Sequence, residues 1–259
     1  MIKKQNFMNK NTFLIFLGTY LLFFISGCSQ PFKEPERPVM VSEQPEESIE
    51  TNPEAVLQDE VKLEKNDWSN VWIEDANTDD KPRFLFVGDS ITEGYYSRVK
   101  ERLVDHYSLG RYTTSKFINN PDYRSELEIV LQRYKFEVIL LNNGLHGWGY
   151  EEADYQEGLE LLIQLLNQFS PEATIIWCQT TPIRQEENTE YLDILNQRVI
   201  ARNQLANKIM NENNYPIIDL YQEMIGFPEY YRIDGFHFTD KGRTAQAEFI
   251  SSFILENYP

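Results

Sequence analysis

Phe84–Thr92 has the sequence Phe-Leu-Phe-Val-Gly-Asp-Ser-Ile-Thr, in which a short apolar run passes directly into a glycine, an aspartate and a serine. Four consecutive apolar residues ended by a glycine predict a strand that is buried on both faces. Apolar residues with helical spacing follow over residues 96–107. Ser90 is therefore expected between a strand and a helix, where free backbone N–H groups stabilise a developing negative charge.

The rest of residues 67–259 repeats this alternation. Strands are expected at residues 84–87, 107–114, 138–141, 173–177 and 217–218, and helices at residues 96–107, 123–134, 155–169, 191–210 and after Thr239. Alternating strands and helices imply one mostly parallel sheet of five strands with helices on both faces, and a segment of this length suits a single domain. In such sheets the ligand site lies beyond the carboxyl ends of the strands, which is where Ser90 is expected.

Asp234-Gly235-Phe236-His237 is a second chemically suggestive segment, just before the last predicted helix. An aspartate and a histidine three residues apart can meet on one turn, so that the carboxylate holds the imidazole tautomer while the other ring nitrogen faces a nucleophile. Gly235 lets the backbone bend between them. Taken alone, this segment also fits a surface turn with a solvated histidine, and Ser90 also fits a capping serine. Both segments fall at the same expected sheet edge, which favours a common site.

Gly88–Thr92 resembles the first block of the SGNH/GDSL hydrolase family, and Asp234–His237 resembles its last block, the Asp-x-x-His pair. The resemblance covers the chain from about residue 83 to its end, in the order of the family. It implies a three-layer α/β/α fold of the flavodoxin-like type with a mostly parallel five-stranded sheet. It also implies a carboxylic ester hydrolase that uses a Ser-His-Asp triad and no cofactor.

The resemblance assigns a role to each member of that triad. Ser90 would attack an ester carbonyl, His237 would take and return the proton, and Asp234 would orient His237. The oxyanion hole of the family combines the N–H of the nucleophile, here Ser90, with donors from a glycine block and an asparagine block.

The asparagine block departs from the family pattern. Where the family has Gly-x-Asn-Asp, Asn142–Trp148 reads Asn-Asn-Gly-Leu-His-Gly-Trp, which resembles one bacterial subgroup of the family. Aligning the glycines places Gly144 on the family glycine and His146 on the family asparagine. A neutral imidazole has one N–H, so His146 can donate to the oxyanion as the asparagine would. Asn143 lies nearby in the sequence and is the alternative donor.

The glycine block is also altered, because residues 112–116 contain no glycine. A backbone N–H of Thr113 or Thr114 is the candidate donor there. Three further residues are candidates for contact with substrate. Trp148 is expected to stack on a sugar; the alternative is that it only packs against other side chains. Thr181 and Arg184 are expected to line the cleft after a strand; the alternative is that they belong to a plain loop.

Residues 1–27 are typical of a lipoprotein signal peptide. Three lysines and no acidic residue precede an uncharged apolar run over residues 13–25, which is too short for a permanent membrane span. The run ends in Ile25-Ser26-Gly27-Cys28, which resembles a lipobox and implies cleavage before Cys28 and lipidation of its thiol. An ordinary secretory signal with an incidental cysteine is the alternative. We expect a protein anchored in the cell membrane by lipid and facing outside the cytoplasm.

Residues 28–66 are predicted to be an acidic, proline-rich, disordered tether, and residues 67–259 the catalytic domain. Five prolines among many glutamates leave this segment without apolar periodicity. Loss of the three signal-peptide lysines moves the formal charge from -17 to -20. Such a charge repels nucleic acid, so no nucleic-acid partner is expected.

The cysteines and histidines predict neither a disulfide nor a metal site. Cys178 is the only cysteine besides Cys28, and its apolar neighbours predict a buried, inert thiol. The three histidines show no metal-ligand spacing.

Three functions are compatible with these features. The leading hypothesis is hydrolysis of acyl esters, acetyl esters above all, on small molecules or carbohydrate. The second is transfer of an acyl group to a surface polysaccharide by the same triad. The third is a non-catalytic carbohydrate-binding protein on this scaffold, motivated by the altered oxyanion blocks; an intact set of Ser90, Asp234 and His237 argues against it.

Overall fold

The structure, a computed structural model, describes residues 61–259. The predicted signal peptide, Cys28 and most of the predicted tether lie outside these residues. The described chain forms a six-stranded sheet with the order β1-β3-β2-β4-β5-β8. The strands are β1 (Ser69–Ile73), β2 (Arg83–Gly88), β3 (Ser108–Thr114), β4 (Val138–Leu141), β5 (Thr174–Cys178) and β8 (Ile217–Ile218). Only β1 is antiparallel to its neighbour, so the predicted mostly parallel sheet is confirmed.

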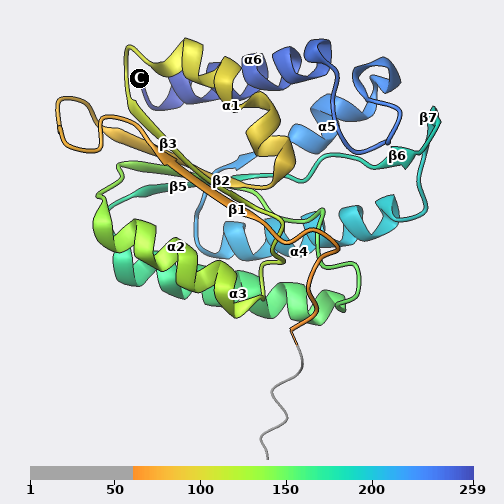
Figure 1. Ribbon diagram of the computed structural model, residues 1–259, viewed down its shortest axis with the longest axis horizontal. Helices are drawn as coiled ribbons and strands as arrows, with labels where there is room; N and C mark the ends of the chain where they lie inside the picture. The colour runs from red at the N-terminus through yellow and green to blue at the C-terminus, as the bar shows by residue number, and fades with distance from the viewer. Residues whose placement is uncertain (1–60) are drawn as a thin grey trace, which may run out of the picture. The chain divides into compact units, whose positions relative to one another are not determined.

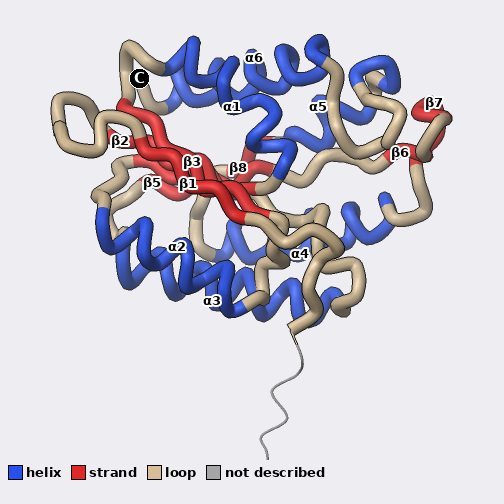
Figure 2. Tube along the Cα trace, in the orientation of Figure 1, coloured by secondary structure: helices blue, strands red, loops and turns tan. Residues whose placement is uncertain are grey.

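Helices cover both faces of the sheet, as the alternation predicted (Figure 1). One face carries α1 (Ser90–Leu103), α5 (Leu220–Ile225) and α6 (Asp240–Asn257); the other carries α2 (Pro121–Arg133), α3 (Glu152–Phe169) and α4 (Asn196–Glu212). Figure 2 shows the strands as one layer between these two groups of helices. None of the helices in residues 61–259 has the length and apolar content needed to cross a membrane.

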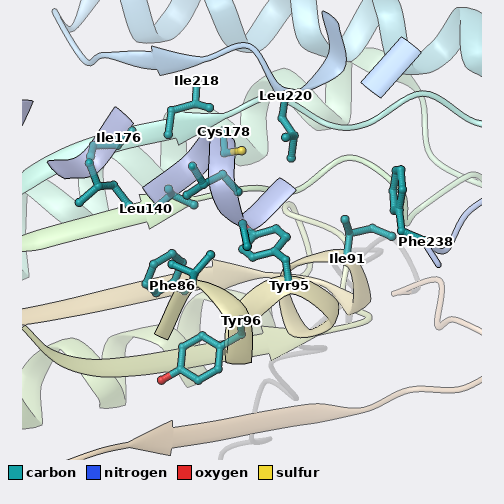
Figure 3. Close-up of a cluster of buried hydrophobic side chains, with 14 of the residues drawn as sticks. Phe86, Ile91, Tyr95, Tyr96, Leu140, Ile176, Cys178, Ile218, Leu220 and Phe238 are labelled. Atoms are coloured by element: carbon teal, nitrogen blue, oxygen red, sulfur yellow. The ribbon is translucent and has the colours of Figure 1, made fainter. Parts of the chain in front are cut away.

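Strand alternation divides the core into two halves. In β2, Phe84 and Phe86 belong to the apolar cluster under α1 and α6, whereas Leu85 and Val87 belong to the cluster under α2 and α3. Figure 3 shows part of the first cluster, including Phe86 of β2 and Tyr95 of α1. Complete burial of side chains of this size stabilises a fold by about 1.5–3 kcal/mol each. The central strands are therefore fixed from both sides, and so are the points at which they end.

The prediction missed three short elements. β1 is an edge strand and makes the sheet six-stranded where five strands were predicted; its apolar run is only three residues long, and Val71 and Trp72 within it are exposed. The hairpin of β6 (Arg184–Gln185) and β7 (Asn188–Leu192) is polar, and α5 is only one and a half turns long. The helix predicted at residues 191–210 begins at Asn196 because residue 191 belongs to β7.

The predicted tether boundary at residue 66 also needs revision. Lys62 and Glu64 are described, and both bind the loop that follows β4. The backbone N–H of Lys62 donates to the hydroxyl of Tyr150 at 2.7 Å, and Glu64 Oε1 accepts the N–H of Gly147 at 2.7 Å. The segment that packs on the domain therefore begins at Lys62 or before it.

Candidate active site

Ser90 is the first residue of α1, directly after β2. Asp89 caps this helix, because its side-chain Oδ1 accepts the N–H of Ile91 at 2.9 Å. Gly88 is needed at the end of the strand, since a Cβ on it would overlap the side chain of Thr92. The first N–H groups of a helix have no partner inside the helix, and the positive end of its dipole lies here. Ser90 thus stands where an anion is stabilised.

Asp234 organises the turn that carries His237. Its Oδ1 accepts the backbone N–H groups of Phe236 and His237 at 2.9 and 2.8 Å. Its Oδ2 lies 3.0 Å from Nδ1 of His237. Gly235, between them, has φ +74°, a conformation that other residues rarely adopt. The carboxylate therefore fixes both the backbone of the turn and the direction of the imidazole.

The second ring nitrogen of His237 reaches Ser90. Its Nε2 lies 2.9 Å from Ser90 Oγ, although the two residues are 147 positions apart in the sequence. Together with Asp234, they form a continuous chain of hydrogen bonds from carboxylate to hydroxyl. With Nδ1–H directed at Asp234, Nε2 carries the lone pair that can accept the proton of the serine. The structure thus brings together the three residues predicted for the triad.

The electrostatics of Asp234 favour this arrangement. Burial raises the pKa of its carboxyl, but the N–H groups of His237 and Phe236 and the imidazole outweigh burial and lower the pKa below its ordinary value of 3.8. The carboxylate is therefore ionised at neutral pH and can stabilise an imidazolium on His237. The side chains of His237 and Asp234 are 39% and 36% exposed, so an ester can approach the site from solvent.

Several of the predicted oxyanion donors make contacts within the protein. Asn143 is buried, and its Nδ2 donates to the carbonyl of Lys116 at 3.0 Å. Nδ1 of His146 lies 3.7 Å from Glu64 Oε1. A neutral imidazole that directs its one N–H at Glu64 has none left on Nε2. Gly144 uses its carbonyl to accept from Arg202 at 2.9 Å. Thr113 pairs with Gly88 in the sheet, next to the serine turn.

Asn142 is a further candidate for an oxyanion donor, which the sequence prediction did not include. It follows β4, and its backbone N–H donates to the carbonyl of Val87 at 2.9 Å, so it lies level with the end of β2. It also lines a small cavity together with Ile91, the residue after Ser90. Its Nδ2 donates to the carbonyl of Cys178 at 2.8 Å, which fixes the amide. The usable signal was its position as the first residue after the strand.

The three residues predicted to contact substrate differ in how accessible they are. Arg184 is 4% exposed, and its guanidinium binds the carbonyls of Thr189 and Ile225, so it packs the β6–β7 hairpin and is unavailable to a substrate. The ring of Trp148 is only partly buried, but the guanidinium of Arg202 lies 4.6 Å from its centre. Thr181 is buried and lines the same cavity as Asn142.

Two further observations, on Cys178 and on metal-binding side chains, bear on alternative chemistry. Cys178 is buried, as predicted, and burial raises the pKa of its thiol far above the ordinary value. A thiol in that state is a poor nucleophile. Within residues 61–259, no group of three or more histidine, cysteine, aspartate or glutamate side chains is arranged to hold a metal ion.

Comparisons with known proteins found one matching family model and several solved structures with a similar fold. The family model described as GDSL-like lipase/acylhydrolase matches residues 86–245, which is more than half of the chain. The solved structure of an acetyl xylan esterase, AlAXEase, is 21% identical with a TM-score of 0.56, covering 66% of this chain and 99% of its own.

Two other solved structures share the fold. A GDSL-like lipase from Bacteroides thetaiotaomicron is 17% identical, with a TM-score of 0.54 and coverage of 67% of this chain and 88% of its own. A lipase/acylhydrolase from Enterococcus faecalis is 18% identical, with a TM-score of 0.53 and coverage of 67% and 95%. No curated protein sequence matches the chain.

Proposed function

The chain belongs to the GDSL-like lipase/acylhydrolase family of ester hydrolases, and we propose that it is a cell-surface serine esterase that removes acyl groups, acetyl above all, from carbohydrate. The observation that carries this proposal is the hydrogen-bonded chain from Asp234 through His237 to Ser90. A triad of this geometry converts a serine hydroxyl into a nucleophile.

The first half of the reaction forms an acyl-enzyme. Ser90 Oγ attacks the ester carbonyl while His237 Nε2 accepts the hydroxyl proton, and Asp234 stabilises the imidazolium. The tetrahedral intermediate then collapses, the bond to the alcohol breaks, and His237 returns the proton to the leaving alcohol. In the second half, water attacks the acyl-enzyme with His237 as base. The products are a carboxylic acid and free Ser90.

The tetrahedral intermediate needs donors that are fixed before the reaction. We assign the N–H of Ser90 and the Asn142 amide to this role. The N-terminal position of Ser90 on α1 supports the first assignment, and the placement of Asn142 beside the end of β2 supports the second. His146 and Asn143 were the earlier candidates, but the ring of His146 faces Glu64, and Asn143 is buried more deeply than Asn142, at 1% against 7% exposed.

Two considerations support the choice of substrate. The structurally similar AlAXEase is an acetyl xylan esterase, which makes an acetylated carbohydrate the natural first candidate. The chain carries a formal charge of -17, which disfavours polyanionic substrates such as nucleic acid. Location at the cell surface rests on the predicted signal peptide and on lipidation of Cys28.

The test is an assay of the full chain with acetylated sugars, a chromogenic acetate ester and the matching longer-chain ester. We expect acetate release from the first two and slower turnover of the longer ester. Ser90→Ala is the control for contaminating esterase. Acyl transfer would be revealed by an acetylated sugar product when a free sugar acceptor is added, and dominance of that product over acetate would replace hydrolysis by transferase activity.

A further inference from the structure

Charged side chains bind nearly every backbone carbonyl group of the loop that joins β4 to α3. We call residues 144–150 the β4–α3 loop. It contains three glycines, and Gly147 has φ +70°. A chain of this composition has high backbone freedom, so its single conformation must come from contacts outside the loop.

Two arginines of α4 bind the carbonyl groups of the loop. Arg202 is fully buried and donates to the carbonyls of Gly144, His146 and Gly147 at 2.9, 2.6 and 3.0 Å. Arg198 donates to the carbonyls of Trp148 and Tyr150 at 2.7 and 2.5 Å. Both guanidinium groups are paired with the carboxylate of Glu152 at the start of α3.

A second set of contacts comes from the N-terminal side of the domain. We call residues 62–64 the strap. Lys62 Nζ donates to the carbonyl of Gly149 at 2.6 Å and lies 5.1 Å from the centre of the Tyr150 ring. Glu64 Oε1 accepts the N–H of Gly147 at 2.7 Å and lies 3.7 Å from Nδ1 of His146. The strap is more than 80 residues away from the loop in sequence.

The strap and the two arginines bind different backbone groups of the loop. Arginine has no acceptor, so of the two backbone polar groups it can bind only the carbonyl, and an N–H of the loop needs a different partner. Glu64 provides a carboxylate for the N–H of Gly147, which is a buried residue in a conformation that favours glycine. The side chain of Glu64 is 27% exposed, so its contacts are partly shielded from water. The cationic arginines thus bind carbonyl groups of the loop, and the anionic Glu64 binds an N–H group of the same loop.

We propose that Glu64 is a positioning residue of the active site: by binding Gly147 and His146, it fixes the β4–α3 loop and through it Asn142. The proposal rests on the proposed function, in which Asn142 stabilises the oxyanion. Asn142 is separated from the loop only by Asn143. A shift of the loop therefore pulls on the backbone next to Asn142, a donor needed chiefly in the transition state, against the hydrogen bond that the hydroxyl of Tyr155 makes to the carbonyl of Asn143 at 2.6 Å.

The test compares Glu64→Ala, Glu64→Gln and Lys65→Ala in the full chain. Lys65 is the matched control because it is an exposed charged neighbour. We expect Glu64→Ala to lower kcat by about 10²-fold, the effect of a misplacement of roughly 1 Å, with KM changed little. Glu64→Gln should recover most of kcat, because its amide oxygen can still accept the N–H of Gly147. Lys65→Ala should match the parent protein.

Hydrogen exchange provides a second measurement that does not depend on turnover. Glu64→Ala should speed amide exchange within residues 144–150, while Lys65→Ala leaves it unchanged. Parent-like kcat in folded Glu64→Ala would overturn the proposal, and so would parent-like exchange in this loop. Activity retained by Ser90→Ala would instead refute the proposed function, so the two failures are distinguishable.

Discussion

The backbone of Arg184 occupies the space beside Gly235 that a side chain would need. A Cβ on Gly235 would overlap the carbonyl group of Arg184, and the N–H of Arg184 donates to the carbonyl of Gly235 at 2.9 Å. The turn with Asp234 and His237 is thus seated directly on the start of the β6–β7 hairpin. The position of the general base depends on this contact.

We expect Gly235→Ala to lower both the melting temperature and kcat. The positive φ alone costs a residue other than glycine about 1–2 kcal/mol, and the overlap with Arg184 adds to this by displacing the turn. Gly226→Ala is the matched control, because a Cβ at Gly226 meets nothing within 4 Å and the backbone there has φ -78°. Thermal melts and ester turnover measure both effects. Equal behaviour of the two variants would contradict this account of the turn.

Asp234→Asn should reduce kcat by about 10⁴-fold, the loss found when the orienting carboxylate of a Ser-His-Asp triad becomes an amide. The same variant should change the dependence of stability on pH. Because the pKa of Asp234 is lowered in the folded protein, its stabilisation is fully present above the ordinary value of 3.8 and is lost as the pH falls through the lowered value. The difference in melting temperature between parent and Asp234→Asn should therefore be largest near neutral pH and shrink in acid. A difference that grows in acid would refute the assignment.

Three substitutions discriminate among the candidate oxyanion donors. Asn142→Ala should lower kcat by about 10²–10³-fold with little change in KM, because the lost interaction forms chiefly in the transition state. His146→Ala should have a smaller effect, since its imidazole faces Glu64. Asn143→Ala should mainly lower the melting temperature, because its amide binds the carbonyl of Lys116. A collapse of kcat in His146→Ala alone would restore the alignment that placed His146 on the family asparagine.

Lipidation of Cys28 stays a prediction, since this residue lies outside the described chain. Metabolic labelling with a fatty-acid analogue should mark the parent protein and not Cys28→Ala. Where the signal peptide is still removed, the variant should also leave the membrane fraction, because the remaining protein of formal charge -20 has little electrostatic attraction to anionic lipid. Equal labelling of both proteins would place the lipid elsewhere.

The parts of the fold that could be predicted were those with a strong local sequence pattern, such as a run of apolar residues or a helix cap. The four consecutive buried residues of β4 and the capping Thr239 before α6 have strong local signals. β1 was missed because a five-residue edge strand with two polar residues and no buried side chain resembles a loop. The triad was predictable because strand ends meet at one edge of a parallel sheet.

Contacts between distant charged residues could not be predicted in the same way. Arg184 was expected to bind substrate because it follows a strand, yet its guanidinium binds carbonyls of the β6–β7 hairpin. Glu64 lies in a segment whose composition is typical of a tether, and its contact with Gly147 depends on a loop far away in the sequence. Sequence spacing carries no information on such pairs.

The most direct test of the central claim is the reaction of the full chain with a fluorophosphonate, which labels activated serines. We predict that the parent protein is labelled on Ser90 alone, and that Ser90→Ala loses both labelling and turnover while it stays folded. Loss of the nucleophile alone costs about 10⁶-fold in kcat in a well-studied serine hydrolase. Labelling of another residue, or parent-like turnover in Ser90→Ala, would contradict the account.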